Sequence, residues 1–171
     1  MVKPLLSANP VRKHRMALGL TIREMARDAG IQYNTLLQLE AGVYTDILPA
    51  ILSFFERQGI ITAPLNKEYK EFQRVLRRAN FRNVDLSLPE PDATVQPMFA
   101  LREQTQLGFT EFYRRLAINA GISSRAETGK VATLPTQIKH ALLDAGMPED
   151  DVEELNYRIG EYHERFVAGR I

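Results

Sequence analysis

Hydrophobic residues recur every three or four positions in several separate segments of this chain, which is the period of an amphipathic α-helix. The first segment begins at Asn9-Pro10, where the asparagine side chain can cap a helix and the proline needs no amide partner. This helix is expected to end near Leu18. A second helix begins at Thr21 and ends at Gly30, where a left-handed residue is tolerated. The pattern therefore predicts two short helices separated by a tight turn.

Three further helices are expected before residue 82. The third spans about residues 32–41 and ends before Gly42, and the fourth occupies residues 47–59, which are apolar over much of the circumference. The fifth, at 65–79, has one apolar seam formed by Leu65, Tyr69, Phe72, Leu76 and Ala79.

The composition changes between Asn83 and Pro97, in the sequence NVDLSLPEPDATVQP. Three prolines and the lack of a helical period are typical of a linker. We therefore predict an N-terminal domain at 1–82, a linker at 83–96 and a C-terminal domain at 97–171. The predicted fold class is all-α, with two small helix-turn-helix bundles of four to five helices each.

The second half of the chain resembles a copy of the first. The segment LAINAGI is set against MARDAGI, and LPTQIKHALLDAGM against LPAILSFFERQGI. With Gly121 aligned to Gly30 in this way, the copy is five residues shorter before its next helix, so an abbreviated third helix is predicted over SSRAETGK. The final helix, at 149–167, has a seam of Val152, Leu155, Ile159, Tyr162 and Phe166.

Composition and charge limit the classes of function. Apolar residues make up 44% and charged residues 25% of the 171 residues, as in folded globular proteins. The absence of cysteine excludes disulfides, and the three separated histidines argue against zinc. Residues 1–83 carry 13 Lys and Arg against 7 Asp and Glu, whereas 84–171 carry 9 against 14. The first half is therefore the better candidate for a polyanion partner.

The sequence TIREMARDAGIQYNTLLQLEAG resembles the helix-turn-helix of the lambda-repressor-like family, the Cro and cI type regulators of phages and bacteria. The resemblance covers roughly residues 10–61 and, more weakly, 97–147. It implies a DNA-binding transcription regulator of phage or mobile-element origin, acting as a repressor or Cro-like protein through the helix around residues 32–41.

Hydrogen-bonding side chains at the start of this third helix fit that function. A helix in the major groove reads base edges with residues near its N-terminus. Asn and Gln can pair with adenine, and a threonine methyl group can contact that of thymine, so a preference for A·T-containing sites is expected. A solvated helix start explains the same polarity without DNA. The expected base contacts are Gln32, Tyr33, Asn34, Thr35 and Gln38.

The resemblance also implies a structural ion pair between Arg15 and Glu40. Two departures from the family remove its usual phosphate contacts: Ile22 replaces a frequent glutamine at the start of the second helix, and residues 43–46 are not basic. Phosphate contacts must then come from other basic residues. The candidates are Arg12, Lys13, Arg23, Arg27, Arg74, Arg77 and Arg78. For the last three, a solvated helix face is an equally good interpretation.

In the second module, two interpretations stay open. Its third helix either reads bases, with arginine suited to guanine, or no longer reaches a groove and only packs against a partner. The candidate base contacts are Ser123, Ser124 and Arg125, and the candidate phosphate contacts are Arg114, Arg115 and Lys130.

No motif of a known catalytic class is present, so an enzyme is not expected. The predicted partner is double-stranded DNA, with no cofactor, metal, small-molecule ligand or membrane, and the predicted location is the cytoplasm of a bacterial host, at the nucleoid. One alternative is a protein-binding adaptor or helical scaffold of phage origin with vestigial DNA-binding modules. Another is a homodimer through the helices at 65–79 or 149–167.

Overall fold

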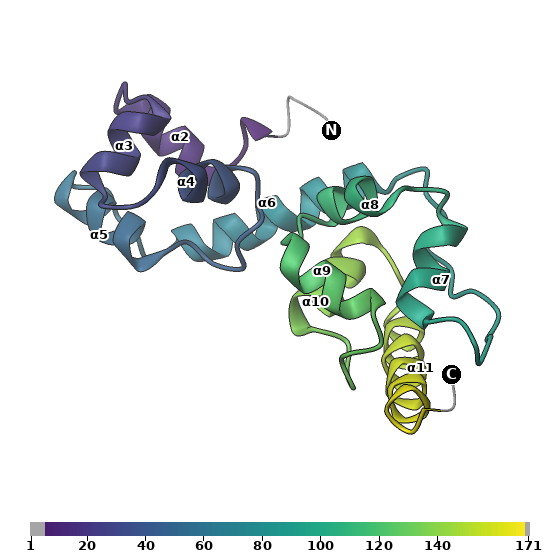
Figure 1. The fold of residues 1–171 in the computed structure, drawn as a ribbon. Helices are drawn as coiled ribbons and strands as arrows, with labels where there is room; N and C mark the ends of the chain where they lie inside the picture. Colours follow the sequence, from purple (N-terminus) through teal and green to yellow (C-terminus); the bar gives the residue numbers. More distant parts are fainter. Residues whose placement is uncertain (1–5, 170–171) are drawn as a thin grey trace. The chain divides into compact units, whose positions relative to one another are not determined.

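The computed structural model describes residues 6–169, and all regular secondary structure in that range is α-helical, which confirms the predicted all-α class (Figure 1). The chain divides into two compact units between Leu76 and Arg77. The division falls inside a helix and lies closer to the N-terminus than the predicted boundary at residue 82. None of the helices in residues 6–169 is long and apolar enough to cross a membrane.

The first unit contains α2 (Pro10–Ala17), α3 (Ile22–Asp28), α4 (Tyr33–Glu40), α5 (Pro49–Arg57) and most of α6 (Leu65–Asn80). Two of these helices begin as predicted. Asn9 caps α2 by accepting hydrogen bonds from the amides of Val11 and Arg12, and Thr21 forms a capping box with Glu24 at the start of α3.

The apolar faces of these helices form one core. Its buried members include Met25, Leu36, Leu39, Ile51 and Phe55. Leu65, Tyr69, Phe72 and Leu76 belong to the same core. The apolar seam of α6 is therefore covered by its own unit, so a homodimer contact through residues 65–79 would have to use other side chains of this helix.

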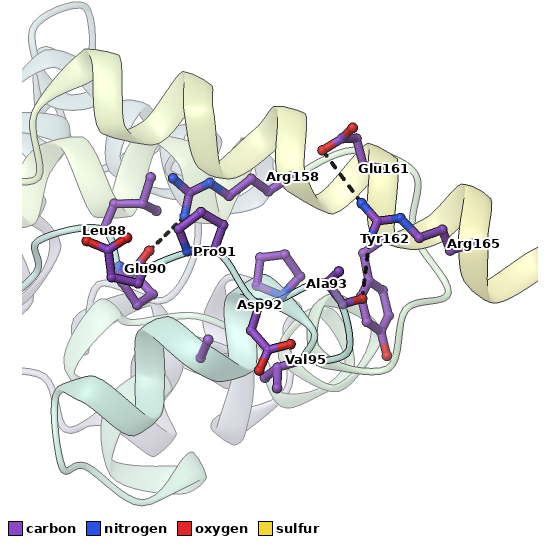
Figure 2. Close-up of a pocket in the computed structure, with 13 residues that line it drawn as sticks. Leu88, Glu90, Pro91, Asp92, Ala93, Val95, Arg158, Glu161, Tyr162 and Arg165 are labelled. Carbon is purple, nitrogen blue, oxygen red and sulfur yellow. Dashed lines mark hydrogen bonds and ion pairs between the residues drawn. The ribbon is translucent and has the colours of Figure 1, made fainter. Parts of the chain in front are cut away.

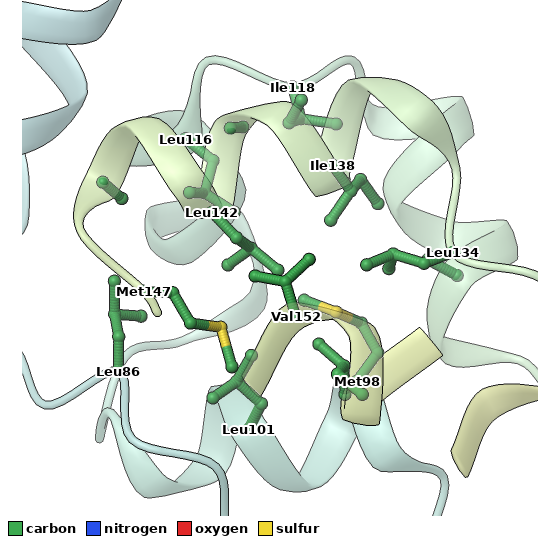
Figure 3. Close-up of a cluster of buried hydrophobic side chains, with 14 of the residues drawn as sticks. Leu86, Met98, Leu101, Leu116, Ile118, Leu134, Ile138, Leu142, Met147 and Val152 are labelled. Carbon is green, nitrogen blue, oxygen red and sulfur yellow. The ribbon is translucent and has the colours of Figure 1, made fainter. Parts of the chain in front are cut away.

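The second unit contains α7 (Pro97–Gln104), α8 (Phe109–Leu116), α9 (Ala120–Glu127), α10 (Thr136–Ala145) and α11 (Glu149–Val167). Figure 3 shows part of its core, in which Leu101, Leu116, Ile138, Leu142 and Val152 converge. The seam of α11 contributes Val152, Leu155 and Ile159 to that core. A homodimer contact through residues 149–167 would therefore have to use the exposed apolar side chains of α11, which include Tyr157, Phe166 and Val167.

The segment predicted to be a linker packs against the second unit. It contains no helix between residues 83 and 96, as expected, but Leu86 is buried in the core, and Val84 and Leu88 pack against that core. Gln96 donates a hydrogen bond to the carbonyl of Ala126. Since these residues bury apolar surface, the segment is part of a folded unit and not a free connector.

The first four helices of the two units recur at a constant spacing of 87 residues. The helices α2, α4 and α5 begin at residues 10, 33 and 49, and α7, α9 and α10 begin at 97, 120 and 136. Left-handed backbone recurs at the same spacing: Gly30 corresponds to Ala117, and Gly42 to Gly129, all with φ between 56° and 82°. The two units therefore share one backbone plan.

The fifth helices correspond with a spacing of 90 residues. The amide of Ile47 donates to Oδ1 of Asn66 at 2.9 Å, and the amide of Leu134 donates to Oδ1 of Asn156 at 2.7 Å. Thus Asn66 on α6 and Asn156 on α11 hold equivalent loops.

This spacing corrects the sequence alignment of the two halves. Gly30 corresponds to Ala117 and not to Gly121, so the sequence alignment was displaced by four residues at this point. The abbreviated third helix predicted from it is wrong: α9 has eight residues, as does α4. Gly30 and Gly121 occur in similar short sequence motifs but at different places in the fold. Gly121 lies inside helix α9, whereas Gly30 lies in the turn after α3.

Candidate nucleic-acid interface

The α3–turn–α4 segment of the first unit brings the predicted base contacts to one exposed surface. Gln32 is the N-cap residue of α4 and makes no side-chain capping bond. Tyr33, Asn34 and Gln38 are exposed, and Thr35 is half-buried. These five residues form what we call the α4 outer face.

The opposite face of α4 is anchored in the core. Leu36 and Leu39 are fully buried, and the carbonyl of Leu39 accepts hydrogen bonds from the side chains of Asn9 and Tyr69 at 3.1 and 2.9 Å. The helical period places Leu36 and Leu39 together on the core side, whereas Leu37 is 44% exposed beside the outward polar residues. The α4 outer face is thus carried by a firmly packed helix.

The predicted ion pair between Arg15 and Glu40 is present and buried. Nε and Nη2 of Arg15 donate to the two carboxylate oxygens of Glu40 at 2.6 and 3.0 Å, while Nη1 donates to the carbonyl of Leu20 at 2.7 Å. The hydrogen bond to Glu40 raises the pKa of the Arg15 guanidinium. The pair therefore connects α2, the α2–α3 turn and the end of α4.

The second unit contains the same arrangement, which the sequence analysis missed. Nε and Nη2 of Arg102 donate to the carboxylate of Glu127 at 2.9 and 3.2 Å, and Nη1 donates to the carbonyl of Leu107 at 3.3 Å. Each of these residues follows its counterpart in the first unit by 87 positions. A search for recurring Arg and Glu at a fixed spacing would have found the pair.

Basic residues of the first unit differ in how available they are to a phosphate. Lys13 and Arg23 are exposed, and the guanidinium of Arg23 lies 5.8 Å from the ring centroid of Tyr33 on the α4 outer face. Arg27 is exposed but pairs with Asp28 at 2.8 Å. Arg12 is half-buried, and its Nε has no hydrogen-bond partner among the described residues.

The basic cluster on α6 does not form one surface. Arg74 pairs with Glu71 at 2.6 Å, and Arg78 is exposed. Arg77 is only 6% exposed, and donates to the Leu116 carbonyl at 2.9 Å and to Asp144 at 2.7 Å. The predicted phosphate contact by Arg77 is therefore wrong, because its donors are engaged inside the second unit.

One of the DNA contacts predicted for the second unit is contradicted by burial, and the others lie on the surface. Ser123 is fully buried, and its hydroxyl donates to the carbonyl of Asn119 at 2.9 Å. It takes the core position that Leu36 occupies in the first unit, so the predicted base contact by Ser123 is wrong. Ser124 and Arg125 are exposed on α9, as is Lys130 after it.

Arg114 and Arg115 are both bound to Glu111, at Nε–Oε distances of 3.0 and 2.8 Å. The hydrogen bond from Arg114, followed by that from Arg115, lowers the pKa of Glu111 to about 2. The two arginines therefore face a carboxylate of their own helix, which offsets part of their charge toward a phosphate.

The outward positions of α9 differ chemically from those of α4. By the spacing of 87, Tyr33, Asn34 and Thr35 correspond to Ala120, Gly121 and Ile122. These three residues present no side-chain hydrogen-bonding group, so the α9 surface lacks most of the donors and acceptors that the α4 outer face offers.

Among the described residues, no cluster of three or more acidic, histidine or cysteine side chains is placed to hold a metal ion. Comparison with protein-family models, with curated proteins and with solved structures gives no match to this chain.

Proposed function

We propose that this protein is a sequence-specific regulator of transcription that binds double-stranded DNA, with α4 of the first unit in the major groove. The observation that carries the proposal is the α4 outer face, where exposed amide and phenol groups cover the N-terminal half of a short, anchored helix. Groove-reading helices contact base edges with residues in that half.

Rigidity of the anchor supports this function. Base readout requires that donors and acceptors be held in place before binding, because ordering them later costs free energy. The buried Arg15–Glu40 pair and the bonds to the Leu39 carbonyl fix the C-terminal end of α4. Arg23 and Lys13 would supply phosphate contacts on the same unit.

Base reading is assigned to the first unit alone. Ala120, Gly121 and Ile122 offer no side-chain partner to a base edge, and Ser123 is buried. The second unit would contribute only contacts to the phosphates of the DNA backbone, through Arg125 and Lys130. A DNA ligand would place the protein at the nucleoid of a bacterial host, and occlusion of a promoter is the expected mode of action.

Selection of bound fragments from a random duplex pool by the full chain tests the proposal. We expect enrichment of one A·T-containing motif, and an affinity that falls steeply as salt is raised, because bound phosphates release counterions. Selection without any enriched motif would refute sequence-specific binding, and exclusively G·C-rich motifs would refute the assigned contacts.

A matched pair of variants locates the base-reading surface. Asn34→Ala with Gln38→Ala is expected to weaken binding to the selected site by about 1–3 kcal/mol per lost bidentate contact. Ser124→Ala with Arg125→Ala is the control, because these residues lie at equivalent or adjacent exposed positions of α9. Equal loss of sequence preference in both variants would contradict the assignment to the first unit.

A further inference from the structure

A cavity of about 160 Å³ in the second unit lies between residues 88–93 and α11 (Figure 2). Nη1 of Arg158 on α11 donates to the carbonyl of Pro89 at 2.7 Å, and Nη1 of Arg165 donates to that of Ala93 at 3.4 Å. The donors on this wall are therefore used to hold a segment of the same chain. On α4 of the first unit, by contrast, large apolar side chains are exposed.

Leu37 is an exposed leucine on the helix that we propose to read bases. Leu37 and Tyr33 are each 44% exposed, whereas Leu36 and Leu39 are fully buried. Positions 33 and 37 are one helical turn apart, so their side chains are neighbours on the surface of α4. Tyr33 and Leu37 together form what we call the α4 apolar edge.

The α4 apolar edge borders the amide groups of the α4 outer face. At about 100° of rotation per residue, Asn34 and Gln38 lie furthest from the core. Leu37 flanks them on one side, and Thr35 flanks them on the other, about 160° around the helix from Leu37. The helix therefore presents a row of amide groups with a row of apolar groups directly beside it.

This combination matches the major-groove edge of an A·T base pair. Adenine offers N7 and N6 to an amide side chain, and the paired thymine offers O4 and a C5 methyl group, which is apolar. The Cβ atoms of residues three apart on a helix are separated by roughly 5–6 Å. Base pairs are stacked about 3.4 Å apart. Asn34 and Leu37 can therefore contact the same base pair or two adjacent ones.

The fold itself does not require a large apolar side chain at position 37. By the spacing of 87 residues, Ser124 corresponds to Leu37 and Ala120 to Tyr33, and both are exposed on α9. The second unit thus has the same backbone plan with a small polar residue at this place. An isolated exposed leucine is ordinary on a protein surface, but Leu37 lies beside the amide groups of a candidate reading helix.

We propose that Leu37, together with Tyr33, contacts the C5 methyl groups of thymines at or next to the adenine bound by Asn34. The inference rests on the proposed DNA-binding function and adds a specificity-determining residue to it. The guanidinium of Arg23 lies 5.8 Å from the ring centroid of Tyr33 and restrains this ring at the N-terminal end of the α4 apolar edge. Burial of Leu37 against a methyl group removes apolar surface of both partners from water.

Replacement of single thymines by deoxyuridine tests the proposal, because it removes the C5 methyl group and leaves the O4 acceptor and the base pairing intact. With the full chain and its selected duplex, we expect at least one replacement to weaken binding about fourfold, the effect of one buried methylene-sized group. Leu37→Ser should bind the thymine-containing duplex more weakly and should not distinguish it from the deoxyuridine-containing one. Serine stands at the equivalent exposed position of α9, so this variant is expected to fold, and an unfolding curve checks this.

Thr35→Ser is the matched control. It removes a methyl group from the opposite flank of α4 and should keep the preference for thymine at the position read by Leu37. If discrimination against deoxyuridine is lost in Thr35→Ser and kept in Leu37→Ser, the methyl contact belongs to Thr35 and the proposal fails.

The unmodified chain provides a test that needs no variant. Binding that tolerates deoxyuridine at every thymine of the selected site would overturn the proposal. Lack of binding to any duplex would refute the proposed function and this inference together. Sequence-specific binding with an unchanged thymine preference in Leu37→Ser would refute only the role of Leu37.

Discussion

Arg102 binds Glu127 in the second unit through the same two-pronged contact by which Arg15 binds Glu40 in the first. In each unit the third guanidinium donor reaches the carbonyl five residues later, at Leu20 or Leu107. This contact connects the first and third helices of each unit. Its recurrence at a spacing of 87 residues is the clearest sign that both units have the same internal arrangement of helices.

Removing one partner of this pair should destabilise its unit strongly. Glu40→Ala leaves Arg15 buried without its carboxylate, and such losses typically cost about 3–5 kcal/mol. The apolar double variant Arg15→Met with Glu40→Leu is expected to lose much less, because no charge stays unpaired. Urea unfolding followed by amide signals of α4 measures both. Lys70→Ala, at the exposed Lys70–Asp46 pair, is the control and should change stability by less than about 1 kcal/mol. A Glu40→Ala variant as stable as this control would contradict a structural role.

Ala117→Gly is expected to stabilise the second unit. Ala117 has left-handed backbone, with φ 56° and ψ 49°, where Gly30 stands in the first unit. For a residue with a Cβ atom this conformation costs roughly 1–2 kcal/mol. The gain is reduced because Ala117 is buried and glycine has a larger chain entropy in the unfolded state. A rise in the unfolding free energy measured by amide signals of α8 checks the prediction, and a fall would show that the methyl contact outweighs the strain.

Gly129→Ala should destabilise the second unit more than Gly146→Ala. Both glycines have positive φ, so backbone strain affects both variants. At Gly129 an added Cβ would also lie 2.8 Å from Cε1 of Tyr162 and 3.3 Å from Cγ of Phe166, whereas it would meet nothing within 4 Å at Gly146. The extra steric cost is typically about 1–3 kcal/mol. Thermal unfolding of the two variants measures the difference, and equal melting temperatures would exclude a close approach of α11.

Substituting an exposed and a buried arginine should separate effects on DNA binding from effects on stability. Arg23→Ala is expected to weaken binding to all duplexes and to reduce the salt slope by about one, while the fold is unchanged, because Arg23 is exposed near Tyr33. Arg77→Ala is expected to lower the stability of the second unit, since it removes bonds to Leu116 and Asp144. Binding isotherms at two salt concentrations, together with unfolding curves, distinguish the effects. If the dependence of DNA affinity on salt is unchanged in Arg23→Ala, then Arg23 does not contact a phosphate.

The stability of the second unit should depend on Glu111 at low pH. Hydrogen bonds from Arg114 and Arg115 lower the folded-state pKa of Glu111 to about 2, below the ordinary value of 4.5. Such a group stabilises the fold at pH values above its unfolded pKa, and this contribution is lost as pH falls from about 4.5 toward 2. Its size is small, because the side chain is 36% exposed and solvent screens the pair. Carboxylate NMR titration should give a midpoint far below those of exposed glutamates, and Glu111→Gln should reduce the acid dependence of unfolding. A midpoint near 4.5 would contradict both.

Local signals in the sequence determined where most helices begin and end. Asn9 and Thr21 cap helices because their side chains reach amides only two or three residues away, and the seam of α6 follows from a helical period that depends on neighbouring residues. The buried Arg15–Glu40 pair was implied by resemblance and is present. These features need little information about the rest of the chain.

Tertiary structure alone decided which residues face the solvent, and it made clear how the two halves correspond. Ser123 is buried and Arg77 is engaged because groups distant in sequence surround them, and the segment at 83–96 packs because its apolar side chains meet the core of the second unit. The spacing of 87 residues is present in the sequence, but the similar short motifs that contain Gly30 and Gly121 led to a misaligned comparison of the two halves. Backbone conformation and long-range hydrogen bonds identify the true counterparts, since equivalent positions must satisfy the same packing even where their side chains differ.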